Sequence, residues 1–286
     1  MRVLEVPSLP FGRGAASRLA CYLSFLAGAL VRGLAAGKPE VVVTLTTPPL
    51  LSLVGAAIQR LRGARHYIWE MDVYPDVAVA LGVLKPHSRL TRELGALADY
   101  ARRRADGIIV LGPCMRDRLA ARGVPPERIH VAENWADGSL IQPRPWPPDG
   151  SLRVLYSGNL GLAHDFDTIS AAMARLASDA RFQFVFAGDG PRRRTVEDFC
   201  RAHAIRNARF LPYQQSARLS EHSGACHVGL VTQTPESLGT VVPSKIYGLM
   251  AAARPVIFIG PPKPLPRSPS IASAAAGKSI PATQNP

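Results

Sequence analysis

The sequence predicts an α/β protein built from two parallel-sheet domains. Short β-rich runs alternate with helical patterns along both halves of the chain, which is typical of βαβ units. A stretch with four prolines in ten residues, QPRPWPPDGS at 142–151, separates the halves as a stiff linker. The 286 residues are 47% hydrophobic, enough for sizeable cores. We therefore expect domains at residues 1–141 and 152–260.

The first half is expected to alternate strands with helices of apolar residues at helical spacing. The strands are predicted at 2–6, 40–45, 66–70, 107–111 and 128–132. The helices are predicted at 15–35, 50–61, 88–104 and 115–122. The β-rich run at 40–45 ends before two prolines and is expected to be buried.

The longest apolar run, LACYLSFLAGALV, lies between Arg18 and Arg32. It is shorter than the roughly 20 residues that a membrane span needs. We expect a core helix or, alternatively, an interfacial helix whose two arginines reach toward lipid headgroups. The net charge of +13 favours anionic partners such as a membrane surface or phosphate-bearing substrates. The first ten residues contain Glu5 and two prolines, which does not indicate a signal peptide.

The second half repeats the alternation and predicts a doubly wound domain of about five strands. The strands are expected at 153–156, 182–187, 209–211, 228–231 and 256–259. The helices are expected at 166–177, 195–203, 217–223 and 244–252. Residues 261–286 are rich in proline and small residues without any regular period, so this tail is expected to be disordered.

A strand, a glycine turn and a helix follow one another within 153–173, and the turn contains Gly158 and Gly161. Glycines let the backbone come close to a ligand, and the free N–H groups of a helix start attract an anion. This arrangement predicts a phosphate-binding site.

Four loops of the second half follow strands and are expected at one rim, since parallel-sheet domains bind ligands at the carboxyl ends of their strands. These loops are Gly158–Gly161, Gly188–Pro191, Pro212–Tyr213 and Thr232–Ser244. Lys245, near a helix start, is expected to meet a diphosphate. The Glu236 carboxylate is suited to accept hydrogen bonds from sugar or ribose hydroxyls.

Other chemistries are less well supported. The four cysteines form no C-x-x-C motif, which favours reduced thiols and a cytosolic location. Asp165-Phe166-Asp167 has the D-x-D form of metal-dependent transferases, but acidic residues at a helix start are ordinary caps. No metal site and no cofactor are predicted. No aromatic-interleaved basic motif indicates nucleic-acid binding. A dehydrogenase with Asp189 as its ribose-binding acid lacks the required glycine spacing.

Six motifs together resemble one known family. They are TTPPL at 46–50, MDVYPDVAVALGVL at 71–84, ENWAD at 133–137, YSGNLGLAHDFDT at 156–168, FAGDGP at 186–191 and VVPSKIYGLMAAARPVIFIG at 241–260. In this order they resemble the retaining family 4 glycosyltransferases of the GT-B fold, nearest to the WbuB-like branch of capsule and O-antigen polysaccharide biosynthesis.

The resemblance implies two Rossmann-like domains that face a cleft, the second binding a nucleoside diphosphate-sugar and the first binding the acceptor. It implies catalytic roles for Asp72 and Glu236, with a loop cap as the alternative role of Asp72. The implied nucleotide-sugar-binding residues are Gly158, Asn159, Gly161, His164, Gly188, Asp189, Gly190, Pro212, Tyr213, Glu236, Gly239, Thr240, Ser244 and Lys245.

The sequence departs from the family at charged positions. Many relatives have Arg and Lys where this chain has Asn159 and His164, so Lys245, a protonated His164 or helix dipoles are expected to neutralise the diphosphate instead. The family's paired glutamates map to Glu236 and Ser244. The chain also begins after the relatives' first strand and ends in an aberrant tail, which predicts a protein truncated at both ends.

The resemblance implies transfer of a sugar, with retention, to a glycan or lipid-linked acceptor in cell-surface polysaccharide biosynthesis. The enzyme is expected in the cytoplasm, with peripheral contact to the anionic inner face of the membrane. An inactive remnant or a nucleotide-sugar-binding module is the alternative, and a nucleotide-dependent dehydrogenase is the weaker one.

Overall fold

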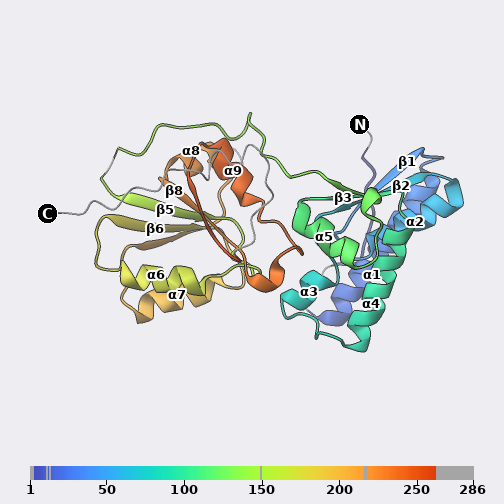
Figure 1. Cartoon of the computed structure of the whole chain (residues 1–286), viewed down its shortest axis with the longest axis horizontal. Helices are drawn as coiled ribbons and strands as arrows, with labels where there is room; N and C mark the ends of the chain where they lie inside the picture. The colour runs from blue at the N-terminus through green and yellow to red at the C-terminus, as the bar shows by residue number, and fades with distance from the viewer. Residues whose placement is uncertain (1–2, 11, 13, 149, 216–217, 262–286) are drawn as a thin grey trace. The chain divides into compact units, whose positions relative to one another are not determined.

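The computed structural model describes residues 3–10, 12, 14–148, 150–215 and 218–261. The chain divides into two compact units; in Figure 1 the first runs from blue to green and includes an orange segment, and the rest, from green to red, is the second. The first unit comprises residues 1–134 and also Gln233–Pro243, and the second comprises residues 135–232 and those from Ser244 onward. This division differs from the two continuous domains expected from the sequence, because the segment 233–243 packs on the first unit.

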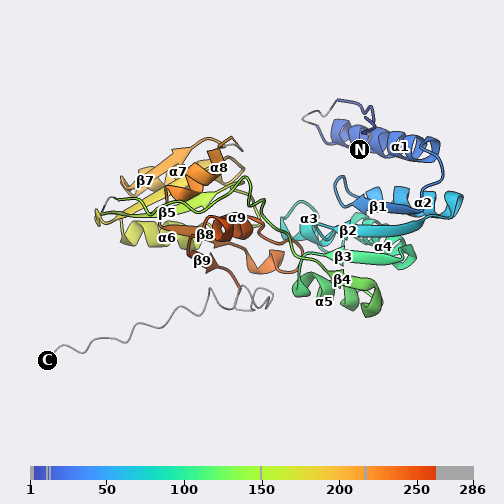
Figure 2. The same ribbon diagram turned by 90° about the horizontal axis from the view of Figure 1, so that it is seen from above.

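The first unit is a parallel sheet with strand order β1-β2-β3-β4. The strands are β1 Val41–Leu45, β2 Arg65–Glu70, β3 Gly107–Val110 and β4 Ile129–Val131. The helices are α1 Ala15–Ala35, α2 Leu51–Arg62, α3 Asp76–Ala80, α4 Arg89–Arg104 and α5 Pro113–Ala121, with 3-10 helices η1 Pro126–Arg128 and η3 Pro235–Ser237. Figure 2 shows α1 beyond β1 and α5 beside β4. The predicted parallel sheet is confirmed.

Two strand predictions in the first unit are wrong. Residues 3–6 form no strand. The strand β1 is not buried, because it lies at the edge of the sheet and pairs with β2 alone among the described strands. Its side chains Val41, Val43 and Leu45 are 43–55% exposed. The short helix α3 was not predicted, since its five residues span little more than one helical turn.

The helix α1 is not a core helix, since none of its described side chains is buried. It packs on α2, and the Leu9 N–H donates to Ser24 Oγ at 3.0 Å. Residues Ala16–Ala35 are long and apolar enough to cross a membrane by length and composition, near the start of the chain. The prediction that this apolar run is too short to span a membrane is therefore corrected, because the helix continues beyond Arg18 and Arg32 at its two ends.

The second unit is a five-stranded parallel sheet with order β7-β6-β5-β8-β9, as the doubly wound prediction required. The strands are β5 Leu152–Ser157, β6 Phe182–Ala187, β7 Ala208–Leu211, β8 Val228–Thr232 and β9 Val256–Ile259. The helices are α6 Asp167–Arg175, α7 Arg193–Ala202, α8 Leu219–Gly224 and α9 Lys245–Ala251. In Figure 1, α6 and α7 cover one face of the sheet, and α8 and α9 cover the other. The strand order reverses at β5, which places a topological switch point beside β8.

The proline-rich segment predicted as a linker is fastened to the second unit. The buried Arg254 guanidinium donates to the carbonyl oxygens of Arg144 and Pro145 at 2.8 and 3.0 Å and lies 5.1 Å from the Trp146 ring centroid. Ser220 Oγ donates to the Leu140 carbonyl at 2.8 Å. These contacts explain why the second unit begins before the prolines. The predicted disordered tail, apart from Pro261, lies outside the described residues.

Candidate functional site

Two glycine loops meet at the carboxyl ends of β5 and β6. Gly158, Gly188 and Gly190 have φ angles of 115°, 136° and 149°, a region that side chains with a Cβ rarely adopt. A Cβ on Gly188 would overlap the Gly158 carbonyl oxygen, and one on Gly190 would lie 2.6 Å from the Leu160 carbonyl oxygen. Glycine is therefore required by backbone conformation and by the close approach of the two loops.

Backbone hydrogen bonds fix the loops to each other. Gly158 N–H donates to the Ala187 carbonyl at 2.8 Å, and Leu160 N–H donates to the Asp189 carbonyl at 2.9 Å. The Asp189 carboxylate accepts from Gly190 N–H at 2.8 Å, so it caps its own loop. The exposed Tyr213 hydroxyl donates to the Asp189 carbonyl at 3.3 Å. The structure thus brings the predicted residues of β5, β6 and β7 together, with Pro212 in the same exposed β7 loop.

Lys245 lies beside the first glycine turn. Its Nζ is 3.7 Å from the centroid of the Tyr156 ring, and its Cε would lie 3.9 Å from a Cβ placed on Gly158. Nζ is buried and has no hydrogen-bond partner among the described residues. Burial lowers the pKa of Lys245 to about 7. A buried ammonium without a partner is costly, so this position favours an anion that supplies the missing counter-charge.

Tyr156 was not predicted as a site residue. Its hydroxyl donates to the Asn159 carbonyl at 2.7 Å, so the ring that supports Lys245 also fixes the turn. The sequence contained a signal for it, because Tyr156 lies two positions before Gly158 and therefore near the carboxyl end of its strand, at the rim of the sheet. Asn159 itself is exposed, and its side chain lies against Gly161 and Gly190.

His164 is neutral near pH 7. Its Nδ1 is 2.6 Å from the Thr232 carbonyl oxygen, which can only accept, so Nδ1 carries the proton and Nε2 is left as an acceptor. Burial, and then the nearby charge of Lys245, lower the pKa of His164 to about 4. Without a ligand the ring is therefore neutral at pH 7, which argues against the prediction that a protonated His164 neutralises a diphosphate. The ring is instead suited to accept a hydrogen bond from a hydroxyl group at Nε2.

Asp165 is a helix cap, as the sequence favoured. Its Oδ1 accepts from the N–H groups of Asp167 and Thr168 at 3.1 and 3.0 Å, and its Oδ2 accepts from the Thr168 hydroxyl. These bonds satisfy free donors at the start of α6. Across the described residues, no group of three or more His, Cys, Asp or Glu side chains is arranged to hold a metal.

Asp72 lies in the first unit, in the loop between β2 and α3. The N–H groups of Met71 and Asp72 both donate to Thr46 Oγ1 at 3.1 Å, which joins the TTPPL and DVYPD motifs. Burial raises the pKa of the Asp72 carboxyl above its ordinary value. The carboxylate is therefore a better hydrogen-bond acceptor than a freely hydrated one would be.

A buried ion-pair network supports this loop. Arg102 donates to Glu70 at 2.5 Å and to the Tyr74 carbonyl at 2.8 Å. Asp99 pairs with both Arg102 and Arg122, and Asp76 pairs with both Arg118 and Arg122. Desolvation raises the pKa of the fully buried Glu70 above its ordinary value, and the charge and hydrogen bond of Arg102 offset part of that rise. The sequence analysis did not identify these pairs, whose members are 3 to 46 positions apart.

Three predicted residues between β8 and α9 pack on the first unit. Glu236 is exposed on η3. Gly239 has a φ of 72°, and a Cβ there would lie 2.8 Å from the Cys114 carbonyl oxygen. The buried Thr240 accepts from Val73 N–H at 2.8 Å through its carbonyl. Thr240 and Gly239 thus have structural roles next to the DVYPD loop. Ser244 is exposed immediately before α9 and makes no side-chain cap.

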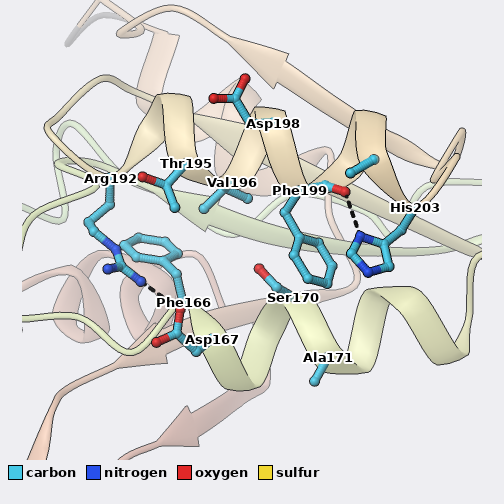
Figure 3. Close-up of a pocket in the computed structure, with 11 residues that line it drawn as sticks. Phe166, Asp167, Ser170, Ala171, Arg192, Thr195, Val196, Asp198, Phe199 and His203 are labelled. Atoms are coloured by element: carbon cyan, nitrogen blue, oxygen red, sulfur yellow. Dashed lines mark hydrogen bonds and ion pairs between the residues drawn. The ribbon is translucent and has the colours of Figure 1, made fainter.

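A separate hollow between α6 and α7 has a volume of about 570 Å³. Figure 3 shows the rings of Phe166 and Phe199 inside it, with an Arg192–Asp167 ion pair of 2.6 Å at one end. The ring of His203 stacks on Phe199, with centroids 3.9 Å apart, at the other end. None of the predicted site residues lines this hollow, so it is not the candidate site.

Comparison with known proteins gives two family matches. Residues 1–135 match the family described as glycosyl transferase 4-like domain, and residues 141–258 match glycosyl transferases group 1. The chain is 28% identical over 237 residues to the probable glycosyltransferase WbjE of Pseudomonas aeruginosa, covering 78% of this chain and 58% of that protein. It is 25% identical over 233 residues to the putative colanic acid biosynthesis glycosyl transferase WcaI of Escherichia coli K12, covering 75% and 56%.

Solved structures share the fold. Sucrose-phosphate synthase of Thermosynechococcus elongatus has a TM-score of 0.66 at 17% identity, covering 88% of this chain and 65% of the other. Anabaena HepE in complex with UDP and glucose has a TM-score of 0.63 at 14% identity, covering 86% and 65%. The chain spans less than two thirds of the length of each of these relatives. The two family matches and the two curated relatives together place the chain among the family 4-type glycosyltransferases of the GT-B fold.

Proposed function

We propose that the chain transfers a sugar from a nucleoside diphosphate-sugar, with retention, to a lipid-linked glycan acceptor in cell-surface polysaccharide biosynthesis. The family and the polysaccharide-related name of WcaI support the reaction class. HepE, whose structure contains UDP and glucose, supports a nucleotide-sugar donor. The observation that carries the proposal is the buried ammonium of Lys245, which lies beside a glycine turn at the rim of the second sheet and has no hydrogen-bond partner among the described residues.

In this proposal the diphosphate binds against Gly158 and Gly161 and pairs with Lys245. The charge that develops on the leaving diphosphate is the main electrostatic demand of the reaction. A fixed cation in a low-dielectric position meets that demand without a metal. The glycine loop that contains Gly188, Asp189 and Gly190 supports the Gly158 turn, since the Leu160 N–H donates to the Asp189 carbonyl and holds the two loops together.

Hydroxyl groups are assigned to acceptors that have no positive charge. His164 Nε2 accepts a donor-sugar or ribose hydroxyl, because its Nδ1 proton is committed to Thr232. Glu236, exposed on η3, accepts further hydroxyls of the donor. Asp72, in the loop after β2, accepts a hydrogen bond from a hydroxyl group of the acceptor substrate or of the transferred sugar. The reaction is placed at the cytoplasmic face of the membrane, as the exposed apolar α1 and the charge of +13 favour.

Calorimetric titration of UDP and GDP tests the donor site. We expect one of the nucleotides to bind more tightly than inorganic phosphate. Lys245→Met should weaken this binding by about 10- to 100-fold, as loss of one charge-assisted contact of 1.4–2.8 kcal/mol implies. Lys85→Met, at an exposed position of the first unit, is the matched control and should bind normally.

Equal affinity for both nucleotides and phosphate would contradict the proposal. An unchanged affinity in Lys245→Met would remove Lys245 from the site. Transfer is measured separately, with radiolabelled donor sugars and lipid-linked acceptors. Nucleotide binding without any transfer would instead identify a nucleotide-sugar-binding module.

A further inference from the structure

The first unit contains an apolar groove of about 400 Å³ that the proposed reaction has not used. Its walls come from four regions of the chain. They include Leu19 and Tyr22 of α1, Pro49 before α2, Tyr74 before α3, Leu81 after α3 and Leu94 of α4. Arg18 is the charged residue among those that line it. The groove is therefore a hydrocarbon surface with one positive charge at α1.

The groove is continuous with an exposed apolar stripe on α1. Leu19, Leu23, Ala27 and Val31 are spaced four residues apart, so they share one face of the helix. All four are exposed, with Leu19, Leu23 and Val31 at 58%, 57% and 66%. Leu19 belongs to both the stripe and the groove wall. A molecule whose apolar part lies on the stripe can enter the groove without crossing a polar surface.

The positive charges lie where an anionic headgroup would meet them. Arg18 and Arg32 are the charged residues of α1, one near each end of the stripe, and both are exposed. An interfacial helix with this pattern binds anionic lipid through its arginines and its apolar face together. The groove offers a volume for one hydrocarbon chain next to the first of these charges.

We propose that this groove binds the hydrocarbon chain of a lipid phosphate, which enters from the membrane surface along α1 with its phosphate at Arg18. A free phosphate has no apolar part to occupy the walls, and a neutral hydrocarbon gains nothing from Arg18. Both parts of the ligand are thus specified by the residues that line the groove.

One residue of the groove lies two positions after Asp72, the residue assigned to the acceptor. Tyr74 lines it, and burial raises the pKa of the Tyr74 phenol, with smaller contributions from the charges of Asp72 and Tyr22. Tyr74, which lines the groove together with Tyr22, therefore lies near Asp72. If the acceptor is lipid-linked, as the proposed function states, its chain lies in the groove while its glycan extends past Tyr74 toward Asp72. This last step rests on the proposed function; binding of the lipid phosphate does not.

The test is titration of the full chain with dodecyl phosphate below its critical micelle concentration, alongside dodecanol and inorganic phosphate. Val83→Glu places a carboxylate at a groove residue that is 69% exposed. Val43→Glu makes the same charge change at a 55% exposed valine of β1 that does not line the groove. Both sites are exposed, so both variants should fold.

We expect dodecyl phosphate to bind more tightly than dodecanol or inorganic phosphate. Binding should be about tenfold weaker in Val83→Glu, since a carboxylate in an apolar groove repels the chain and the phosphate, and normal in Val43→Glu. Arg18→Gln should reduce the affinity toward that of dodecanol. UDP should bind all variants equally and should not displace dodecyl phosphate, which keeps a failure of the donor site distinct from a failure of the groove.

Several results would overturn the proposal. They are equal losses in the two valine variants, binding of inorganic phosphate as tight as that of dodecyl phosphate, displacement by UDP, and no binding at all. Binding to anionic phospholipid vesicles without binding of dodecyl phosphate would also overturn it, because α1 would then act as a membrane anchor alone. A dimer that Val83→Glu dissociates would assign the groove to a second copy of the chain.

Discussion

The two units treat their buried cations in opposite ways. In the first unit, Arg102 is 3% exposed and donates to a Glu70 carboxylate that is 1% exposed, and it also pairs with Asp99. In the second unit, Lys245 Nζ is buried over an aromatic ring and has no hydrogen-bond partner in the part of the chain that the structure describes. The paired arginine already has its counter-charges, whereas the lysine gains a counter-charge only when an anion binds. This difference separates a structural cation from a binding one.

The network of the first unit has a structural task. It holds the DVYPD loop through the Tyr74 carbonyl and Asp76, so it fixes the backbone that presents Asp72. A buried pair is weak evidence for added stability, but removing one partner leaves an unpaired buried charge. The two units therefore differ in how stability and binding respond to mutation.

The largest expected effect is on the folding of the first unit. Arg102→Ala should lower the free energy of unfolding by about 3–5 kcal/mol, because it leaves Glu70 buried without its partner. The measurement is urea denaturation followed by circular dichroism. Arg89→Ala, which breaks the exposed i,i+4 pair with Glu93, is the control and should change stability by less than about 1 kcal/mol.

A double variant sharpens the same point. Arg102→Met with Glu70→Met removes both charges and should recover much of the lost stability. If the double variant is no more stable than Arg102→Ala, the loss comes from packing or from the bond to Tyr74 rather than from the stranded carboxylate.

The next effect is on the glycine loops of the second unit. Gly188→Ala should lower the free energy of unfolding by about 1–3 kcal/mol, because a Cβ at φ 136° is strained, and because it overlaps the Gly158 carbonyl. Gly138→Ala is the matched control, since nothing lies within 4 Å of a Cβ there. Thermal unfolding of both variants measures the difference, and equal stability would mean that the two loops are not held in contact.

Much of the fold follows from local sequence patterns. The five strands of the second unit were predicted to within about two residues, because each is a short apolar run that ends at a glycine, proline or polar loop. The Gly158 turn was predicted for the same reason. The φ angles of 115° to 149° in these turns strongly favour glycine, and the positions of glycine can be read directly from the sequence.

What the sequence could not predict depends on distant partners. The exposure of β1 and α1 depends on which elements lie beside them, and an apolar run reads the same at an edge as in a core. The packing of Gly239 and Thr240 on the first unit depends on Cys114 and Val73. The neutral state of His164 depends on its burial and on the charge of Lys245 in α9. Local patterns record none of these contacts.

The pH dependence of nucleotide binding tests the unpaired lysine. In the folded chain the pKa of Lys245 is about 7, below its ordinary value of 10.5. Bound diphosphate favours the ammonium, so binding above pH 7 should take up a proton, and affinity should fall by up to about tenfold per pH unit. Without ligand, unfolding takes up this proton between pH 7 and 10.5, so stability should rise with pH across that window.

Calorimetry of UDP at pH 6, 7, 8 and 9, in buffers with different ionisation enthalpies, measures the affinity and the proton uptake on binding. Lys245→Arg is the control, because its charge persists throughout this range and its affinity should not change with pH. The same pH profile in both proteins would show that Lys245 does not titrate on binding.

The smallest expected effect comes from His164, whose two ring nitrogens have different roles. His164→Asn can keep a donor to the Thr232 carbonyl but loses the Nε2 acceptor, so it should weaken binding of the preferred nucleotide-sugar by about 2- to 10-fold, the range of one hydrogen bond. Titration of the sugar and of its nucleotide alone separates a sugar contact from a ribose contact. Because the pKa of His164 is about 4, neither protein should bind more tightly between pH 7 and 5.5 on account of this ring. If affinity rose at low pH and His164→Asn abolished that rise, the ring would be a cation in the complex. The second unit would then have two binding cations, Lys245 and His164, to set against the paired structural cations of the first unit.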